Sequence, residues 1–188
     1  MSRLPLQSIE SAPEASRPYL EKALANNGFL PNLVASLANA PTALEAYLRM
    51  AEINGRSGLS LAERETVQIT AAGIHGCGFC VAGHTAVALK KAGLPAATVN
   101  ALRDQTPLDD SRLQAVATFT RAVIAQRGAV SDAALAGFKQ AGFSDANALE
   151  VVLGVSLATL CNFANNLARN DLNPELVPYR WEPKAPAA

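Results

Sequence analysis

Two cysteines and a histidine stand close together near the middle of the chain, at Cys77, Cys80 and His84. At about 100° per residue, positions i, i+3 and i+7 share one face of a helix, so the three side chains are expected to face the same way. Gly76 and Gly78 flank the first cysteine and let the backbone adjust there. The two thiols could therefore form a reversible disulfide, with the histidine near enough to take a thiol proton.

Cys80 is expected in the first turn of the helix that follows Cys77. Unpaired backbone N–H groups and the helix dipole favour negative charge at that position. A cysteine there is more readily ionised, and the thiolate is the form that attacks disulfides and peroxides. The spacing thus indicates a redox-active dithiol with Cys80 as the attacking thiol.

Glu65 lies on the segment before the cysteines and interrupts an apolar stripe between Leu61 and Ile69. A carboxylate on a core-facing stripe needs a partner, because burying it unpaired costs several kcal/mol. We expect His84 or the thiols to be that partner. A glutamate beside the imidazole would orient the ring and raise its basicity.

Other interpretations of these residues remain open. A zinc site could be drawn from His75, Cys77, Cys80 and His84, although one short segment would have to supply all four ligands and no second Cys-x-x-Cys is present. Both cysteines could instead be inert core residues, and Glu65 could lie on the surface. We interpret Cys161, on an apolar segment, as a core residue and His75 as a turn residue. We expect no metal and no cofactor.

The composition is that of one globular domain. The chain has 188 residues, 49% of them hydrophobic, and 16 basic residues balance 16 acidic ones. We find no basic patch of the kind that binds nucleic acid. We also find no signal peptide and no apolar stretch long enough to span a membrane, so we expect a cytoplasmic protein. In that compartment a close cysteine pair is more often catalytic or metal-binding than structural. Charged residues make up only 17%, which suggests that part of the surface is covered by another subunit.

Helix starts and stops punctuate the whole chain, and no alternating pattern predicts a strand. Capping residues and apolar periodicity predict an all-α helical bundle with helices near 17–25, 33–38, 41–55, 60–74, 78–92, 95–103, 110–127, 132–141 and 144–169. Residues 1–172 are expected to form a single helical domain that carries the redox motif at 65–84. Residues 173–188 contain four prolines and are expected to form an extended or disordered tail.

Glu65, the segment Cys77-Gly-Phe-Cys80 and His84 together resemble the motif of the alkylhydroperoxidase D-like proteins, within the carboxymuconolactone decarboxylase superfamily. The resemblance covers about residues 28–170, including the loop that starts at Gly28. Some family members carry a histidine between the cysteines, where this chain has Gly78 and Phe79. That departure puts in doubt a proton relay through this position, but not the dithiol.

The resemblance implies an all-helical subunit that assembles into homotrimers or homohexamers. It implies that Cys80 attacks a hydroperoxide, that Cys77 resolves the sulfenic acid, and that His84 and Glu65 relay protons. It also implies an external dithiol or lipoyl-type protein as reductant and a peroxiredoxin as a partner. The predicted function is therefore a thiol-dependent hydroperoxide reductase or disulfide oxidoreductase.

Two other functions stay open. The first is a carboxymuconolactone decarboxylase-like lyase that uses His84 and Glu65 for acid–base chemistry, although decarboxylating members generally lack the Cys-x-x-Cys. The second is a non-enzymatic redox-sensing or metal-binding module. The physiological substrate and electron donor are not encoded in any motif.

Overall fold

The computed structural model describes residues 2–182, and all regular structure in that range is helical. The helices are η1 (Glu14–Ser16), α1 (Arg17–Asn27), α2 (Asn32–Leu37), α3 (Pro41–Gly55), α4 (Leu61–Ile74), α5 (Gly78–Lys90), α6 (Ala96–Asp104), α7 (Ser111–Ala125), α8 (Asp132–Gln140), α9 (Asp145–Ala168) and η2 (Pro174–Tyr179). The predicted all-α bundle is confirmed, and the predicted helix ends agree with these bounds to within a few residues.

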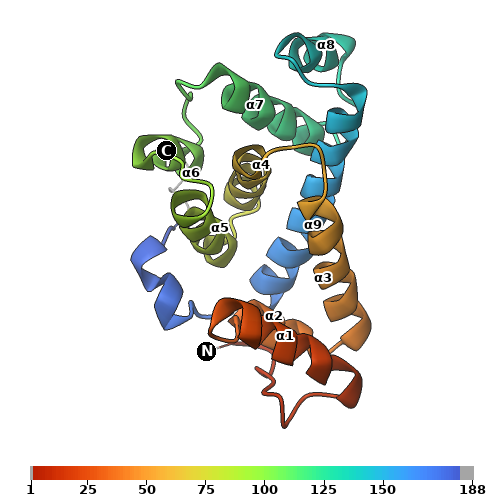
Figure 1. Cartoon of the computed structure of the whole chain (residues 1–188), viewed down its shortest axis with the longest axis vertical. Coiled ribbons are helices and arrows are strands. Elements are labelled where there is room, and N and C mark those ends of the chain that lie inside the picture. The colour runs from red at the N-terminus through yellow and green to blue at the C-terminus, as the bar shows by residue number, and fades with distance from the viewer. Residues whose placement is uncertain (1, 183–188) are drawn as a thin grey trace.

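The helices are arranged around α4 (Figure 1). This helix lies in the middle of the molecule and packs against α5, α7 and α9. The N-terminal helices α1 and α2 lie at one end, and α7 and α8 lie at the other. Since α4 and α5 are the two segments with the predicted reactive residues, the rest of the bundle surrounds them and holds them in place.

The local sequence explains why α4 and α5 begin and end where they do. The Ser60 hydroxyl accepts the backbone N–H of Glu63, and the Glu63 carboxylate accepts the N–H of Ser60, so the predicted capping box is present. Gly76 follows the end of α4 with a φ of 66°, a left-handed conformation that glycine adopts at little cost. This turn leads directly into Cys77, the N-cap of α5.

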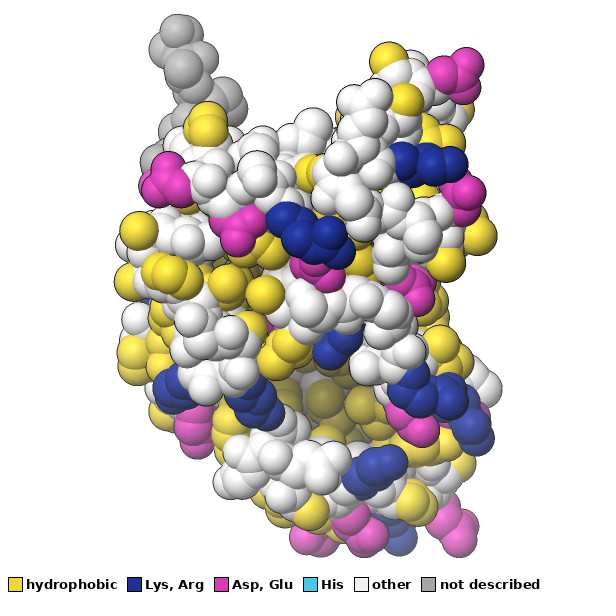
Figure 2. All heavy atoms as spheres, turned by 45° about the horizontal axis from the view of Figure 1, so that its top comes forward, with side chains coloured by type: hydrophobic (Ala, Val, Ile, Leu, Met, Phe, Trp, Pro, Cys, Tyr) yellow, Lys and Arg dark blue, Asp and Glu magenta, His cyan; other side chains and the backbone are white. Residues whose placement is uncertain are grey.

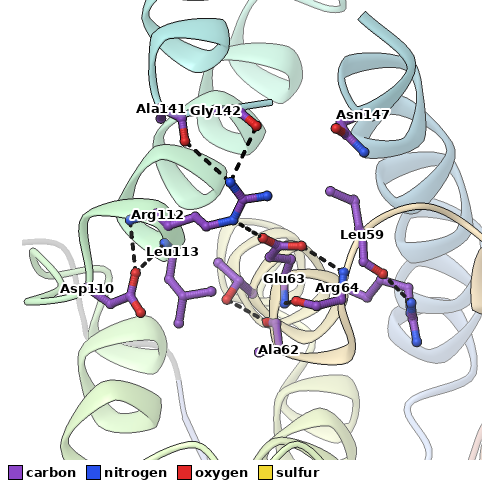
Figure 3. A network of polar contacts seen from close by, with 12 residues as sticks. Leu59, Ala62, Glu63, Arg64, Asp110, Arg112, Leu113, Ala141, Gly142 and Asn147 are labelled. Atoms are coloured by element: carbon purple, nitrogen blue, oxygen red, sulfur yellow. Dashed lines mark hydrogen bonds and ion pairs between the residues drawn. The ribbon is translucent and has the colours of Figure 1, made fainter. Parts of the chain in front are cut away.

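A polar network joins α4 to the far end of the bundle (Figure 3). Nε of Arg112 on α7 lies 2.5 Å from Oε1 of Glu63, whose side chain is only 6% exposed. The same guanidinium lies over the ring of Phe143 and donates to the carbonyls of Ala141 and Gly142 in the α8–α9 connection. The guanidinium of Arg112 therefore connects α4, α7 and the segment before α9 through charged hydrogen bonds.

The longest helix, α9, is buried on one side only. It packs against α2, α3, α4 and α7, and its outer face leaves large apolar side chains exposed: Leu149, Val152, Phe163 and Leu167. This helix of 24 residues is long and apolar enough to cross a membrane, a property that core helices of soluble proteins share. Its packing within the bundle is that of a core helix with one uncovered face.

The expected extended tail is wrong for its first half. Residues Pro174–Tyr179 form the 3-10 helix η2, which packs against α5 and buries Leu176. The carbonyl of Trp181 comes so near Gly78 that a Cβ there would lie 2.8 Å from it. The prolines suggested a free tail, but Leu176 and the small Gly78 let the segment dock instead. Residues 183–188 lie outside the described range.

Candidate redox site

The two cysteines of the motif lie at the start of α5, inside the protein. Cys77 is the N-cap and is fully buried, and its Sγ accepts the backbone N–H of Cys80 at 3.4 Å. Cys80 follows in the first helical turn and is 4% exposed. Both sulfurs are reduced and unbridged. The positions predicted from the sequence are therefore occupied as expected, with both thiols near a helix N-terminus that favours negative charge.

His84 and Glu65 form the predicted pair. Nδ1 of His84 lies 2.8 Å from Oε2 of Glu65, and the two side chains are 28% and 8% exposed. Burial lowers the pKa of His84, but the charge and the hydrogen bond of Glu65 outweigh it, so that the pKa is raised overall. Because the carboxylate holds a proton on Nδ1, Nε2 is the nitrogen available to exchange protons.

A third thiol joins this site from the other end of the chain. Cys161 on α9 is 2% exposed, belongs to the same packed cluster as Cys77 and Cys80, and hydrogen-bonds with Cys80. Its Sγ also lies 3.4 Å from the carbonyl of Ala158 within its own helix. Interpreting Cys161 as a core residue was right about its burial but missed its contact with the reactive pair.

The hydrogen bonds among the thiols determine where the protons lie. The hydrogen bond from Cys80 lowers the pKa of Cys161, as does the nearby charge of His84, and the hydrogen bond from Cys80 also lowers the pKa of Cys77. The pKa of Cys80 itself is raised, because its side chain hydrogen-bonds with Cys161 and Cys77 and is buried. These hydrogen bonds and burial oppose the ready ionisation of Cys80 that the helix N-terminus predicted, so a neighbouring group must take its proton before it can attack.

A cavity of about 930 Å³ opens next to these groups. Cys80, His84 and Cys161 line it, whereas the fully buried Cys77 does not. Most of the wall is apolar, and three other elements, α2, α3 and η2, contribute to it through Leu33, Val34, Leu48 and Leu176. A molecule in the cavity can therefore reach Cys80 and Cys161 but not Cys77.

Tyr47 on α3 contributes a polar group to the same cavity. Burial raises the pKa of its phenol, and the negative charges of the nearby cysteines and Glu65 raise it further. The phenol therefore stays protonated and can donate a hydrogen bond to a bound molecule.

Positive charges surround the cavity. Lys22, Arg49, Lys90 and Lys91 lie on its rim, with Glu52 as the acidic member. Figure 2 shows a hollowed face with hydrophobic side chains inside and Lys and Arg side chains around it. Arg49 is paired with Glu45, and the ammonium group of Lys90 lies over the ring of Tyr179, so the rim retains a net positive field.

His75 lies apart from the reactive groups, at the end of α4. Its Nδ1 lies 3.0 Å from the side-chain amide of Asn162, and its ring contacts Phe163 edge-on. Within residues 2–182, no group of three or more His, Cys, Asp or Glu side chains is placed to hold a metal ion. The geometry therefore offers no support for the four-ligand zinc site drawn from the sequence.

The described geometry agrees with comparisons to known proteins. Residues 41–110, which contain Glu65, both cysteines of the motif and His84, match the model of the Carboxymuconolactone decarboxylase family. Over this segment the chain is similar to that family, and its fold is that of the alkylhydroperoxidase D-like proteins. The family match spans α3 to the N-cap of α7, and no curated protein matches the chain.

Several solved structures share this fold. A peroxidase-related protein with an alkylhydroperoxidase AhpD core, from Ralstonia eutropha JMP134, is 22% identical with a TM-score of 0.84, over 93% of this chain and 94% of that one. A peroxidase-related protein from Silicibacter sp. TM1040 is 22% identical with a TM-score of 0.78, over 93% and 92%. The debrominase Bmp8, solved with 2,3,4-tribromopyrrole, is 14% identical with a TM-score of 0.74, over 94% of each chain.

Two site residues, Cys161 and Tyr47, were not predicted from the sequence. Each stands on an apolar helical stripe, which made core burial the simplest interpretation. The available signal was the residue type, since a thiol and a phenol on core-facing stripes both carry polar hydrogens that need partners.

Proposed function

We propose that this protein is a thiol-dependent hydroperoxide reductase in which Cys77 and Cys80 cycle between dithiol and disulfide. The observation that carries this proposal is that Cys80 lines one cavity together with His84, which is paired with Glu65. A nucleophile, a proton carrier and a group that orients the carrier are thereby brought together.

The proposed reaction begins when His84 takes the proton of Cys80 and the Cys80 thiolate attacks the outer oxygen of the hydroperoxide. The O–O bond breaks, and the leaving alkoxide takes a proton from His84 and departs as the alcohol. Cys80 becomes a sulfenic acid. Cys77 then loses its proton, and its thiolate attacks the Cys80 sulfur. The S–O bond breaks, the departing hydroxide takes up that proton and leaves as water, and a disulfide remains.

An external dithiol restores the pair through a mixed disulfide. Following the resemblance, we propose a lipoyl-type protein as the electron source and a peroxiredoxin as a further partner in a cytoplasmic system. We also propose that the chain works as a homotrimer or homohexamer. The uncovered apolar face of α9 supports assembly, because exposed apolar side chains of this size mark interaction surfaces.

The cavity favours an organic hydroperoxide over hydrogen peroxide. Its volume of about 930 Å³ and its apolar walls suit an apolar body, and the positive rim suits an acidic group on the same molecule. An acid-bearing organic hydroperoxide is therefore the proposed substrate class. A fatty acid hydroperoxide should be reduced with a lower KM than its methyl ester, and the difference should shrink at high salt.

The decisive experiment is replacement of Cys80 by serine. The Cys80→Ser variant should lose dithiothreitol-dependent reduction of cumene hydroperoxide to the level of the buffer, while its melting temperature stays close to that of the wild type. Full activity in this variant would rule out the proposed nucleophile.

A lyase that uses His84 and Glu65 as an acid–base pair is the second candidate, and the 2.8 Å contact between them favours it. That chemistry needs no thiol, so turnover of a lactone substrate should survive the loss of Cys77 and Cys80 together. A non-enzymatic redox or metal module would instead show a bound metal, or a change of assembly on oxidation, without turnover.

A further inference from the structure

We infer that Cys161 is a second resolving thiol: it forms a disulfide with Cys80 as an alternative to the Cys77–Cys80 bridge. This inference rests on the proposed function, since it concerns the fate of an oxidised Cys80. It adds a residue that lies outside both the motif and the family match at 41–110.

The placement of the three sulfurs carries the inference. Cys80 and Cys161 belong to one packed cluster where α5 packs against α9, and both line the same cavity. A hydrogen bond between the two side chains shifts the pKa of each. Cys77 also contacts Cys80, through the backbone N–H of Cys80 and through the thiols. Cys80 is therefore the middle member of the cluster, with a possible bridging partner on each side.

The surroundings of Cys161 favour it as a working thiol rather than a passive neighbour. Its hydrogen bond with Cys80 and the charge of His84 lower its pKa, although burial opposes them. In the first step His84 takes the proton of Cys80 and passes it to the departing alkoxide. Cys161 keeps its own proton beside the new sulfenic acid.

The Cys80–Cys161 disulfide then forms by the same chemistry as the Cys77–Cys80 disulfide. His84 takes the proton from Cys161, and the Cys161 thiolate attacks the sulfur of the Cys80 sulfenic acid. The S–O bond breaks, the departing hydroxide takes a proton from His84, and water and the Cys80–Cys161 disulfide result. The hydroperoxide is the oxidant throughout.

Accessibility distinguishes the two bridges. Cys80 and Cys161 both line the cavity, whereas Cys77 is fully buried and does not. A reductant that enters the cavity could therefore attack either sulfur of the Cys80–Cys161 bridge. For the Cys77–Cys80 bridge it could reach Cys80 alone.

The sequence makes the two bridges separable by peptide mapping. Trypsin cuts after Arg64, Lys90, Lys139 and Arg169, so Cys77 and Cys80 fall in peptide 65–90 and Cys161 falls in peptide 140–169. A Cys77–Cys80 bridge is internal to one peptide and lowers its mass by two hydrogens. A Cys80–Cys161 bridge joins two peptides.

The test uses a Cys77→Ser variant treated with one equivalent of cumene hydroperoxide and then alkylated. We expect both remaining thiols to be lost and peptides 65–90 and 140–169 to be joined. The matched control, Cys77→Ser with Cys161→Ala, should instead hold a sulfenic acid on Cys80 that dimedone traps. Cys80→Ser should leave Cys161 fully alkylated.

The outcomes separate the two proposals. If Cys77→Ser accumulates the sulfenic acid while Cys161 remains alkylated, the inference on Cys161 is overturned and the proposed function stands. If Cys80 stays alkylated in every variant, the proposed function itself fails. Should the variants not fold, limited oxidation of the wild type decides: a mixture of the internal and joined peptides is expected, and the internal bridge alone would overturn the inference.

Discussion

Two glutamates on α4, Glu63 and Glu65, stand two residues apart with 5% and 6% of their surface exposed, yet they lie in different environments. Glu63 pairs with Arg112 and closes the capping box at the start of the helix (Figure 3). Glu65 pairs with His84 beside the thiols. Both glutamates have a basic partner, but only the histidine partner changes its charge near neutral pH.

The chemistry of the partner decides the role of each glutamate. A guanidinium keeps its charge at all physiological pH values, so the Glu63 pair can only hold helices together. An imidazole gains and loses a proton near neutrality, so the Glu65 pair can also move protons. Burial alone therefore does not distinguish a structural carboxylate from a functional one.

The largest expected effect comes from Glu65→Gln. The amide keeps the shape of the side chain but cannot stabilise an imidazolium, so hydroperoxide reduction should fall about 100-fold, the lower end of the usual range for general acid–base groups. The limb of the pH–rate profile that reports the titration of His84 should move to lower pH, because the pKa of His84 would no longer be raised. Steady-state rates across pH measure both changes.

Glu63→Gln is the matched control for that variant. It removes the same charge from the same helix at nearly the same burial, but away from the thiols. Activity should stay within about twofold of the wild type, which lies well below the effect expected for a general acid–base group. An equal loss of activity in both variants would contradict the division of roles.

Arg112→Met should have the next largest effect, on stability rather than on rate. It leaves Glu63 buried without its cation, which costs about 2–3 kcal/mol, less than for a fully buried pair because Arg112 is 48% exposed. That loss corresponds to about 5–10 °C in melting temperature for a chain of this size. Thermal unfolding measures it, and activity well below the melting temperature should be unchanged.

Ser60→Ala should weaken the same network more gently. It removes the hydroxyl that accepts the N–H of Glu63, and loss of such a cap costs about 1 kcal/mol. Denaturant titration should detect this loss with an unchanged slope. A variant with Ser60→Asp, which keeps a capping oxygen, should recover most of it.

The smallest effect is a difference in pH dependence between the two pairs. Because the folded-state pKa of His84 is raised, its pairing with Glu65 contributes fully below the ordinary pKa of histidine and weakens as the pH rises through the raised value. The destabilisation caused by Glu65→Gln should therefore shrink between pH 6 and pH 9. The destabilisation caused by Arg112→Met should stay constant, and equal slopes would show that His84 is not charged in the folded protein.

Local rules accounted for most of the fold. Ser60, Asp110, Ser131 and Ser144 all cap helices through their side chains, as their positions before apolar periodic segments predict. The tail was misjudged, because its docking depends on the burial of Leu176 in the core cluster beside α5 and on the absence of a side chain at Gly78. Such contacts between distant segments leave no periodic signal.

The site residues show the same difference between local spacing and contacts across the fold. The residues close in sequence, Cys77, Cys80 and His84, could be placed from helix geometry, and Glu65 was placed by an interrupted stripe. Cys161 lies 81 residues after Cys80, so only the packing of α9 against α5 brings the two sulfurs together. Helical periodicity predicts on which face of its helix a residue lies, but not which other helix packs against that face.

The cavity is built by parts of the chain that differ from those that carry the reactive groups. The segment 41–110 contains Glu65, Cys80 and His84, whereas α1, α2 and η2 supply much of the wall from outside it. Substitutions in the wall can therefore change which molecules enter while the proton transfers at Cys80 continue unaltered. Such a division lets substrate preference diverge independently of chemistry, which gives one scaffold room to acquire new substrates through its flanking helices.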